Sequence, residues 1–249
     1  IAIIGEIGYN ITISTINGSL EAQSTNLTPL LAWVGQKGGG ALRGKLILGG
    51  TNKRQGASLA MTGQGIDIPT AGIHINALDS TAKIDDTQPL SGLTADINAS
   101  EVKMKSLHLK SAKLHSSFNN ERHNYTLQTQ GFAGGKPLDL QSAGNINADF
   151  NQFTMQSLQG NYASQPLMLA KAITLTKQNN NMVLSPLMLR IGSGEVTAEG
   201  MVSAITLRAS AKMNNIALKQ FDTSYPSVIL DSSLVLTGSG AYPALTMSN

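Results

Sequence analysis

Apolar and polar residues alternate one by one along most of this chain, and this alternation is the feature that most restricts its fold. Between Pro137 and Phe150, one parity carries Leu138, Leu140, Ile146, Ala148 and Phe150, and the other carries Asp139, Gln141, Asn145, Asn147 and Asp149. Successive side chains of a β-strand point to opposite faces, so the two sets separate onto two sides. The sequence therefore predicts an antiparallel sheet with one apolar face and one solvated face.

The same pattern recurs along the chain at short, irregular intervals. From Ile205 it gives Leu207, Ala209, Ala211 and Met213 on one side and Thr206, Arg208, Ser210, Lys212 and Asn214 on the other. Further strands are predicted near Ile11 and Leu20 and over residues 42–48, 102–111, 123–130 and 181–191. Others are predicted to start at about residues 57, 72, 93, 171 and 195. A succession of strands without intervening helices indicates a meander and an all-β fold, not βαβ units.

Two segments depart from the strand pattern. In NLTPLLAWVGQKGGG, Thr28 is expected to cap a short helix that Pro29 opens and that Gly35 or the Gly38–Gly40 run ends. The segment IALKQFDTSYP from Ile216 fits either a helical turn or the end of a strand. We therefore expect one or two short helices.

Composition excludes several classes of function. Aromatic residues make up 4% of the chain, and its net charge of +3 comes from scattered lysines and arginines. Nucleic-acid surfaces usually combine basic runs with aromatic stacking platforms, so we expect no nucleic-acid partner. The absence of cysteine excludes disulfides, zinc–thiolate sites and cysteine nucleophiles.

Motifs that would indicate catalysis or metal binding fit the strand pattern better. The run Gly39–Lys45 has the glycine and lysine spacing of a phosphate loop, but Leu46 stands where the hydroxyl residue belongs. The four histidines have no metal-ligand spacing, and His108 falls on the polar side of a predicted strand. Asp85 and Asp86 lie in a turn-like segment. We expect no catalytic residue, no metal site and no cofactor.

Lysines also alternate with apolar residues in EVKMKSLHLKSAKLH. Lys103 and Lys105 flank Met104, which is typical of a solvated strand face, although acidic lipid headgroups are a second potential partner. At the amino end, the apolar run IAIIGEIGY is far shorter than the roughly 20 residues that cross a bilayer. The chain begins without methionine or a signal peptide, so we expect a piece of a longer protein with its membrane anchor elsewhere.

The carboxy-terminal segment MNNIALKQFDTSYPSVILDSSLVLTGSGAYPALTMSN joins a leucine-rich stretch, a proline, a strand of the form xLxLTGSG and a closing YPAL. This order resembles the repeating pattern of the TamB family, within the wider AsmA-like group of large Gram-negative envelope proteins. NLTPLLAWVGQKGGGALRGKLILGG is similar to the same unit, with its short helix and glycine-led strand. RHNYTLQTQG followed by KPLDLQSAGNI resembles the family's His-x-x-x-Leu strand and its glycine-ended neighbour. The resemblance covers roughly residues 25–249.

The resemblance implies a long antiparallel sheet curled into an open apolar groove, the β-taco shape, over residues 1–249 as one continuous segment. It further implies a periplasmic protein anchored in the inner membrane, phospholipid transport between the two membranes, and a TamA-like, BamA-like outer-membrane barrel partner. The residues expected to line the groove against phospholipid acyl chains are Leu127, Leu138, Leu140, Ile146, Phe150, Leu175, Leu187, Leu189, Ile191, Val202, Leu207 and Met213.

Three functions are consistent with a one-sided apolar sheet. The first is a non-enzymatic, bridge-like phospholipid conduit, because acyl chains need only hydrocarbon contact. The second is a chaperone-like scaffold whose sheet edge accepts strands of outer-membrane proteins. The third is a surface solenoid or stalk, which is disfavoured because the chain has no fixed repeat period.

Overall fold

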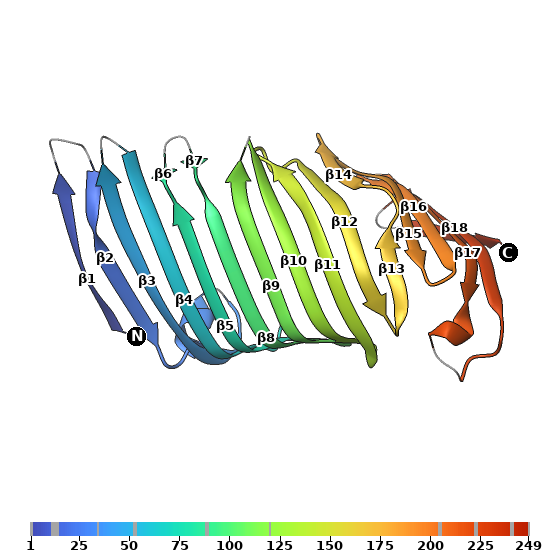
Figure 1. Cartoon of the computed structure of the whole chain (residues 1–249), viewed down its shortest axis with the longest axis horizontal. Helices are drawn as coiled ribbons and strands as arrows, with labels where there is room; N and C mark the ends of the chain where they lie inside the picture. The colour runs from blue at the N-terminus through green and yellow to red at the C-terminus, as the bar shows by residue number, and fades with distance from the viewer. Residues whose placement is uncertain are drawn as a thin grey trace. The chain divides into compact units, whose positions relative to one another are not determined.

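The computed structural model describes residues 2–10, 15–33, 35–51, 54–87, 90–119, 121–203, 206–221, 224–239 and 242–248 (Figure 1). Its first elements are β1 (Ala2–Asn10), β2 (Thr15–Ser24), α1 (Thr28–Trp33), β3 (Gly39–Thr51), β4 (Arg54–Ile68), β5 (Ile73–Ile84), β6 (Asp86–Thr87), β7 (Leu90–Ser91), β8 (Thr94–Met104), β9 (Leu107–Asn119) and β10 (Arg122–Ala133). The later elements are β11 (Lys136–Asn147), β12 (Gln152–Tyr162), β13 (Gln165–Leu169), β14 (Ile173–Gln178), β15 (Asn181–Ile191), β16 (Gly194–Val202), β17 (Leu207–Ala217), the 3₁₀-helix η1 (Leu218–Gln220), β18 (Ile229–Ser239) and β19 (Tyr242–Ser248).

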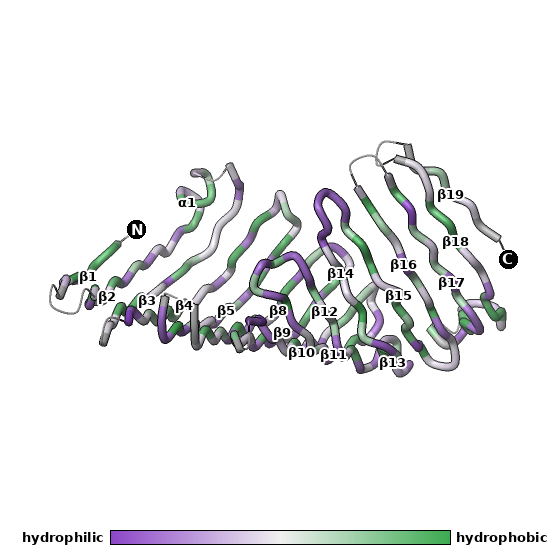
Figure 2. The backbone as a smooth tube through the Cα atoms, turned by 90° about the horizontal axis from the view of Figure 1, so that it is seen from above, coloured by the Kyte–Doolittle hydropathy of each residue, from purple (hydrophilic) through white to green (hydrophobic). Residues whose placement is uncertain are grey.

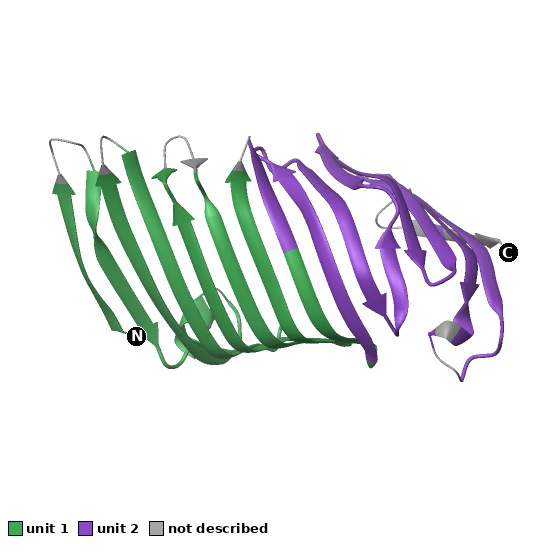
Figure 3. Ribbon diagram, in the orientation of Figure 1, with its two compact units in different colours: residues 1–120, 127–135 green, residues 121–126, 136–249 purple. Residues whose placement is uncertain are grey.

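The chain divides into two compact units (Figure 3). Unit 1 holds residues 1–120 and 127–135, and unit 2 holds residues 121–126 and 136–249, so β10 contributes to both. That the whole chain forms one continuous groove segment stays a prediction.

Strands in unit 1 pair in the order β1, β2, β3, β4, β5, β8, β9, and every pair is antiparallel. The small hairpin of β6 and β7 lies in the connection between β5 and β8. In unit 2, β13 and β14 both lie between β12 and β15, end to end along the direction of the strands. From β15 the ladder continues antiparallel to β19. The predicted all-β antiparallel fold is therefore confirmed.

The predicted helix is also present, but its cap differs from the expectation. The side-chain oxygen Oδ1 of Asn26 accepts a hydrogen bond from the amide of Thr28, while the Thr28 hydroxyl donates to the carbonyl of Gly38 at 2.7 Å. The prediction that Thr28 is the cap is thus wrong. At the other end, Gly35 has φ +70°, and the amide of Gln36 donates to the carbonyl of Leu31, a typical helix ending.

Several predicted strand limits need correction. The segment 102–111 is not one strand, because a turn at Lys105 and Ser106 separates β8 from β9. The amino-terminal run forms β1, which the sequence pattern did not indicate. At Ile216, both alternatives hold in part, since β17 ends at Ala217 and η1 follows. The expected strand residues Ile11 and Ile205 lie outside the described residues.

Alternation in unit 1 shifts by one residue at a bend across the ladder. The residues at this bend do not form register pairs with the neighbouring strands. Two of them, Gly65 and Glu101, have φ values of +56° and +49°. A Cβ on Gly63 would meet Ile66 Cδ1 at 2.6 Å, so Ile66 lies on the same face as Gly63. The extra residue bends the strands while keeping the apolar side chains on one face.

A local packing feature fixes β11 in unit 2. The ring of Tyr125 in β10 stacks on Phe153 in β12 at a centroid distance of 5.6 Å. To do so it crosses Gly144 of β11, where the partner register shifts between Ala143 and Gly144. Only a residue without a side chain leaves room there.

We predict that Gly144→Val lowers the free energy of unfolding by about 1–3 kcal/mol, because overpacking forces the ring or the strand to move. Its Cβ would overlap the carbonyl oxygen of Thr154 and meet Tyr125 Cε1 at 2.8 Å. Urea denaturation measures the change. As a control, Gly49→Ala meets no atom within 4 Å and should not lower the stability. Equal stabilities for the two variants would contradict the stacking arrangement.

Candidate functional site

Directly opposed residues of an antiparallel ladder share a face of the sheet, so register assigns the faces of unit 2. One row runs from β11 to β18 through Ile146, Phe153, Leu175, Leu184, Gly200, Ala209 and Leu236. A second row runs through Leu169, Leu189, Val196, Met213 and Ser232. A third joins Met182, Val202 and Leu207, and a fourth joins Leu140, Gly160, Leu167 and Ile191. We call these rows the apolar face of unit 2.

Ten of the twelve predicted lining residues lie on this face: Leu138, Leu140, Ile146, Leu175, Leu187, Leu189, Ile191, Val202, Leu207 and Met213. Leu127 lies two residues beyond Tyr125 in β10, so it shares the side of the strand that carries that ring. Most are half-buried, whereas Val202 is 43% exposed. That they contact lipid stays a prediction.

Phe150 is the exception, and its placement on the predicted strand is wrong. Strand β11 ends at Asn147, whose Oδ1 accepts hydrogen bonds from the amides of Asn151 and Gln152. These bonds close a turn that takes Phe150 out of the ladder, where it has φ +54° and is 68% exposed. Its ring instead contacts His123 at a centroid distance of 5.0 Å.

Register shifts in β15 and β17 keep apolar residues on this face where simple parity would fail. In β15 the register shifts between Leu184 and Leu187, and the bulge accommodates Pro186, which has no amide to donate. The Ser185 hydroxyl of the same bulge accepts a hydrogen bond of 2.7 Å from the amide of Thr174. In β17 an equivalent shift lies between Met213 and Ile216.

The structure adds members that the sequence pattern missed. Phe153, Met155 and Leu158 of β12 change parity at the register shift, which hid them from a period-two search. Leu234 and Leu236 of β18 do alternate regularly, and their spacing in SSLVLTG was the available signal. Figure 2 shows this alternation of apolar and polar residues along the strands.

Within the described part of the chain, no second layer of helices or strands packs on the apolar face of unit 2. Among the described residues of the whole chain, the buried apolar residues are Leu27, Leu109, Leu169 and Ile216, which are 6–9% exposed. The extensive contacts within each unit join strands that are neighbours in the sheet. At one end, Phe221 after η1 lies beside Tyr162, with the two ring centroids 6.1 Å apart. The face is thus apolar and open over most of its length.

Unit 1 has an equivalent face. One of its rows runs through Leu20, Leu46, Leu59, Ala82 and Ala95. The opposite face carries ion pairs, including Lys45 Nζ at 2.7 Å from Glu21 Oε1. The hydrogen bond and charge of Lys45, with Arg43 nearby, lower the pKa of Glu21 below its ordinary value. Lys45, which ends the phosphate-loop-like run, is therefore a strand residue that faces water.

His74, His108 and His115 belong to the same polar surface of unit 1. His108 Nε2 lies 2.6 Å from Glu101 Oε2, and His115 Nδ1 lies 2.7 Å from Asp96 Oδ1. His108 is thus paired with a carboxylate and is not simply solvated. Within the described ranges, no three histidine and acidic side chains come together as metal ligands would. Asp86, which was expected in a loop, is buried in β6 and lies 3.7 Å from Arg54.

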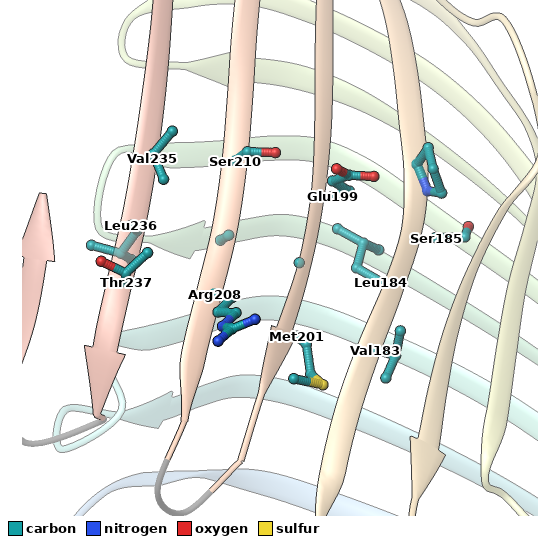
Figure 4. Close-up of a pocket in the computed structure, with 13 residues that line it drawn as sticks. Val183, Leu184, Ser185, Glu199, Met201, Arg208, Ser210, Val235, Leu236 and Thr237 are labelled. Atoms are coloured by element: carbon teal, nitrogen blue, oxygen red, sulfur yellow. The ribbon is translucent and has the colours of Figure 1, made fainter. Parts of the chain in front are cut away.

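A shallow pocket of about 490 Å³ lies on the polar face of unit 2 (Figure 4). Its floor is the row Val183, Met201, Arg208 and Thr237, beside Glu199, Ser210 and Val235. None of the predicted lining residues belongs to it. Apolar side chains thus also occur on the polar face, where Val183 lies opposite Met201, but the row continues to Arg208 and Thr237, which distinguishes it from the row from Ile146 to Leu236.

Comparison of the chain with protein-family models, curated proteins and solved structures finds no match in any of the three. The described residues also include no helix of the length and apolarity that a membrane crossing requires.

We predict that three positions in β17 react with a water-soluble thiol reagent at three different rates. The chain has no cysteine, so each single-cysteine variant gives a clean signal. Lys212→Cys on the exposed face should react fastest, Met213→Cys on the open apolar face more slowly, and Ile216→Cys, only 6% exposed in the native protein, slowest. Equal protection of Met213→Cys and Ile216→Cys would indicate that the apolar face is closed.

Proposed function

We propose that this chain is a non-enzymatic phospholipid carrier in which acyl chains lie against the apolar face of unit 2. The single observation that carries the proposal is the combination of continuous apolar rows with the small number of buried apolar side chains. An extended apolar surface in contact with water is unfavourable, by roughly 25 cal/mol for each Å². Such a surface in a stable protein therefore favours a partner that covers it.

The chemistry of the face supports hydrocarbon as that partner. Its rows are built mainly from leucine, isoleucine, valine, methionine and alanine, and the row from Ile146 to Leu236 carries no charged side chain. The charged side chain of Lys177 lies at the end of the face, opposite Met182. Hydrocarbon needs close contact and no directional hydrogen bonds. Flexible methionines such as Met155, Met182 and Met213 adapt to chains of different shape.

The direction of the rows supports movement along the sheet. Each row crosses successive strands, so an acyl chain leaving one strand meets another apolar side chain about 4.8 Å further on. Gly200 and Ala209 have little or no side chain, so the middle of the row from Ile146 to Leu236 projects little from the sheet. A phospholipid can therefore shift from strand to strand without passing a polar barrier, which is the physical requirement of a conduit.

The resemblance to the TamB family agrees with this proposal and extends it. On that basis the chain is a segment of a periplasmic, inner-membrane-anchored protein of a Gram-negative bacterium that carries phospholipids between the two membranes. A TamA-like barrel is the proposed outer-membrane partner.

We predict that Ala209→Glu abolishes phospholipid binding, whereas Ser210→Glu does not. These neighbours in β17 are both small, and the same charge is added on opposite faces. An ionised group in the path of an acyl chain must lose its water, and this cost should lower the bound lipid at least about tenfold. Mass spectrometry of co-purifying lipid and fluorescent-lipid transfer between vesicles measure the effect.

Ser210→Glu is the matched control, and circular dichroism should show both variants folded. If folded Ala209→Glu retained as much phospholipid as Ser210→Glu, lipid would not travel on this face and the proposal would be wrong. Wild-type protein that carries no phospholipid would also contradict it.

A second candidate function rests on β1. Figure 1 shows β1 as the outermost strand of unit 1, and Ile3, Ile4, Ile7 and Tyr9 on its two sides are 62–76% exposed. An exposed apolar edge strand is a template for another strand. This observation favours the chaperone-like scaffold, in which β1 would receive a strand of an outer-membrane protein.

We predict, for this second function, that a synthetic amphipathic barrel strand cross-links to Gly8→Cys in β1 through its own cysteine. A matched cysteine at Gly49 in the interior strand β3 should give no cross-link, because both edges of β3 are already paired. Equal cross-linking at both positions would indicate random collision and would remove the scaffold function.

A further inference from the structure

The short helix α1 is attached firmly over one end of the apolar face of unit 1. The amide of Leu27 donates to the carbonyl of Gly40 at 2.8 Å, and the Thr28 hydroxyl donates to Gly38. Leu27 is itself buried, with 7% of its surface exposed. Both bonds tie the amino-terminal end of α1 to the chain at the start of β3, which positions the helix above the strands.

A pocket of about 310 Å³ lies beneath α1. Leu30 of the helix forms its roof, and the floor consists of Leu20, Leu42, Leu46, Leu59 and Met61 from β2, β3 and β4. The register puts these floor residues on the apolar face, where Leu20 is opposite Leu46 and Leu46 is opposite Leu59. Helix and sheet therefore border an aliphatic groove that is partly open to solvent and that neither fills.

The volume of this space is unusual for a structural core. Protein interiors are packed as densely as organic crystals, and an apolar cavity of about 150 Å³ already binds benzene. The pocket under α1, which is partly open to solvent, has about twice that volume. A fixed roof over an unfilled aliphatic floor indicates a seat for a ligand.

We propose that this pocket holds the methyl end of one unbranched acyl chain. The proposal rests on the proposed function, since it names where the tail of a carried lipid ends. The wall has no charged side chain, which suits an uncharged chain end and excludes a headgroup. At the rim, the Ser24 hydroxyl donates to the carbonyl of Asn26 at 2.7 Å and is thus already engaged.

Gly44 is a position from which a larger side chain can fill the pocket without disturbing the strand. A Cβ at Gly44 would meet Met61 Cγ at 3.6 Å and the Ala60 carbonyl at 3.8 Å, which are ordinary contacts. The substitution Gly44→Leu therefore directs an isobutyl group into the space. Gly49 of the same strand has the opposite parity and is exposed, and Gly49→Leu is the matched control.

Spin-labelled fatty acids test the proposal through the methyl signals of methionine. A nitroxide near the tail end should broaden the Met61 methyl resonance in the wild-type protein, and a nitroxide beside the carboxylate should broaden it much less. In Gly44→Leu, each displaced methylene should weaken binding about fourfold, so loss of about three gives at least about thirtyfold. Gly49→Leu should behave as the wild type.

Met155 and Met213, on the apolar face of unit 2, separate the possible failures. Broadening there without any at Met61, or equal Met61 broadening in Gly44→Leu and the wild type, would overturn the tail seat alone. Absence of broadening at all three methionines would overturn the proposed lipid binding as well. Unchanged thermal unfolding of Gly44→Leu shows that the variant is folded.

Discussion

The cross-strand register of the antiparallel ladder is the constraint on which the rest of this structure depends. Backbone hydrogen bonds hold each residue opposite a defined partner, and opposed side chains share a face. Slipping one strand by one residue would move its whole apolar set into water. In unit 2 the rows that contain Phe153, Leu175 and Leu184, or Leu189, Val196 and Met213, stay apolar across successive strands.

Irregularities in the ladder preserve this register rather than disturb it. The bulge at Ser185 and Pro186 and the left-handed residues Gly65 and Glu101 each absorb one residue. Without that extra residue, the alternation after each point would present polar side chains to the apolar face. Glu101 is held in its strained conformation partly by its 2.6 Å contact with His108.

Coverage of the apolar faces is the second consequence. A sheet of this kind usually buries its apolar side against a second layer. Among the described residues, short helical segments between consecutive strands cover one end of each face, through α1 between β2 and β3 and through η1 between β17 and β18. Most apolar side chains therefore remain half-buried, which suits a mobile ligand better than a fixed core.

The sequence by itself determined the all-β class, the helix near Leu30 and most of one apolar face, because strand periodicity is a local property of the backbone. Leu140, Leu189 and Leu207 could be assigned for that reason. Three features could not be assigned from the sequence: the position of Phe150, the change of alternation before Leu158 and the pocket beneath α1. The first depends on hydrogen bonds of the Asn147 side chain, the second on a bulge opposite Ala143, and the third on packing between α1 and three strands. Only the tertiary structure decided these features, because each arises from contacts between groups that period-two alternation does not relate.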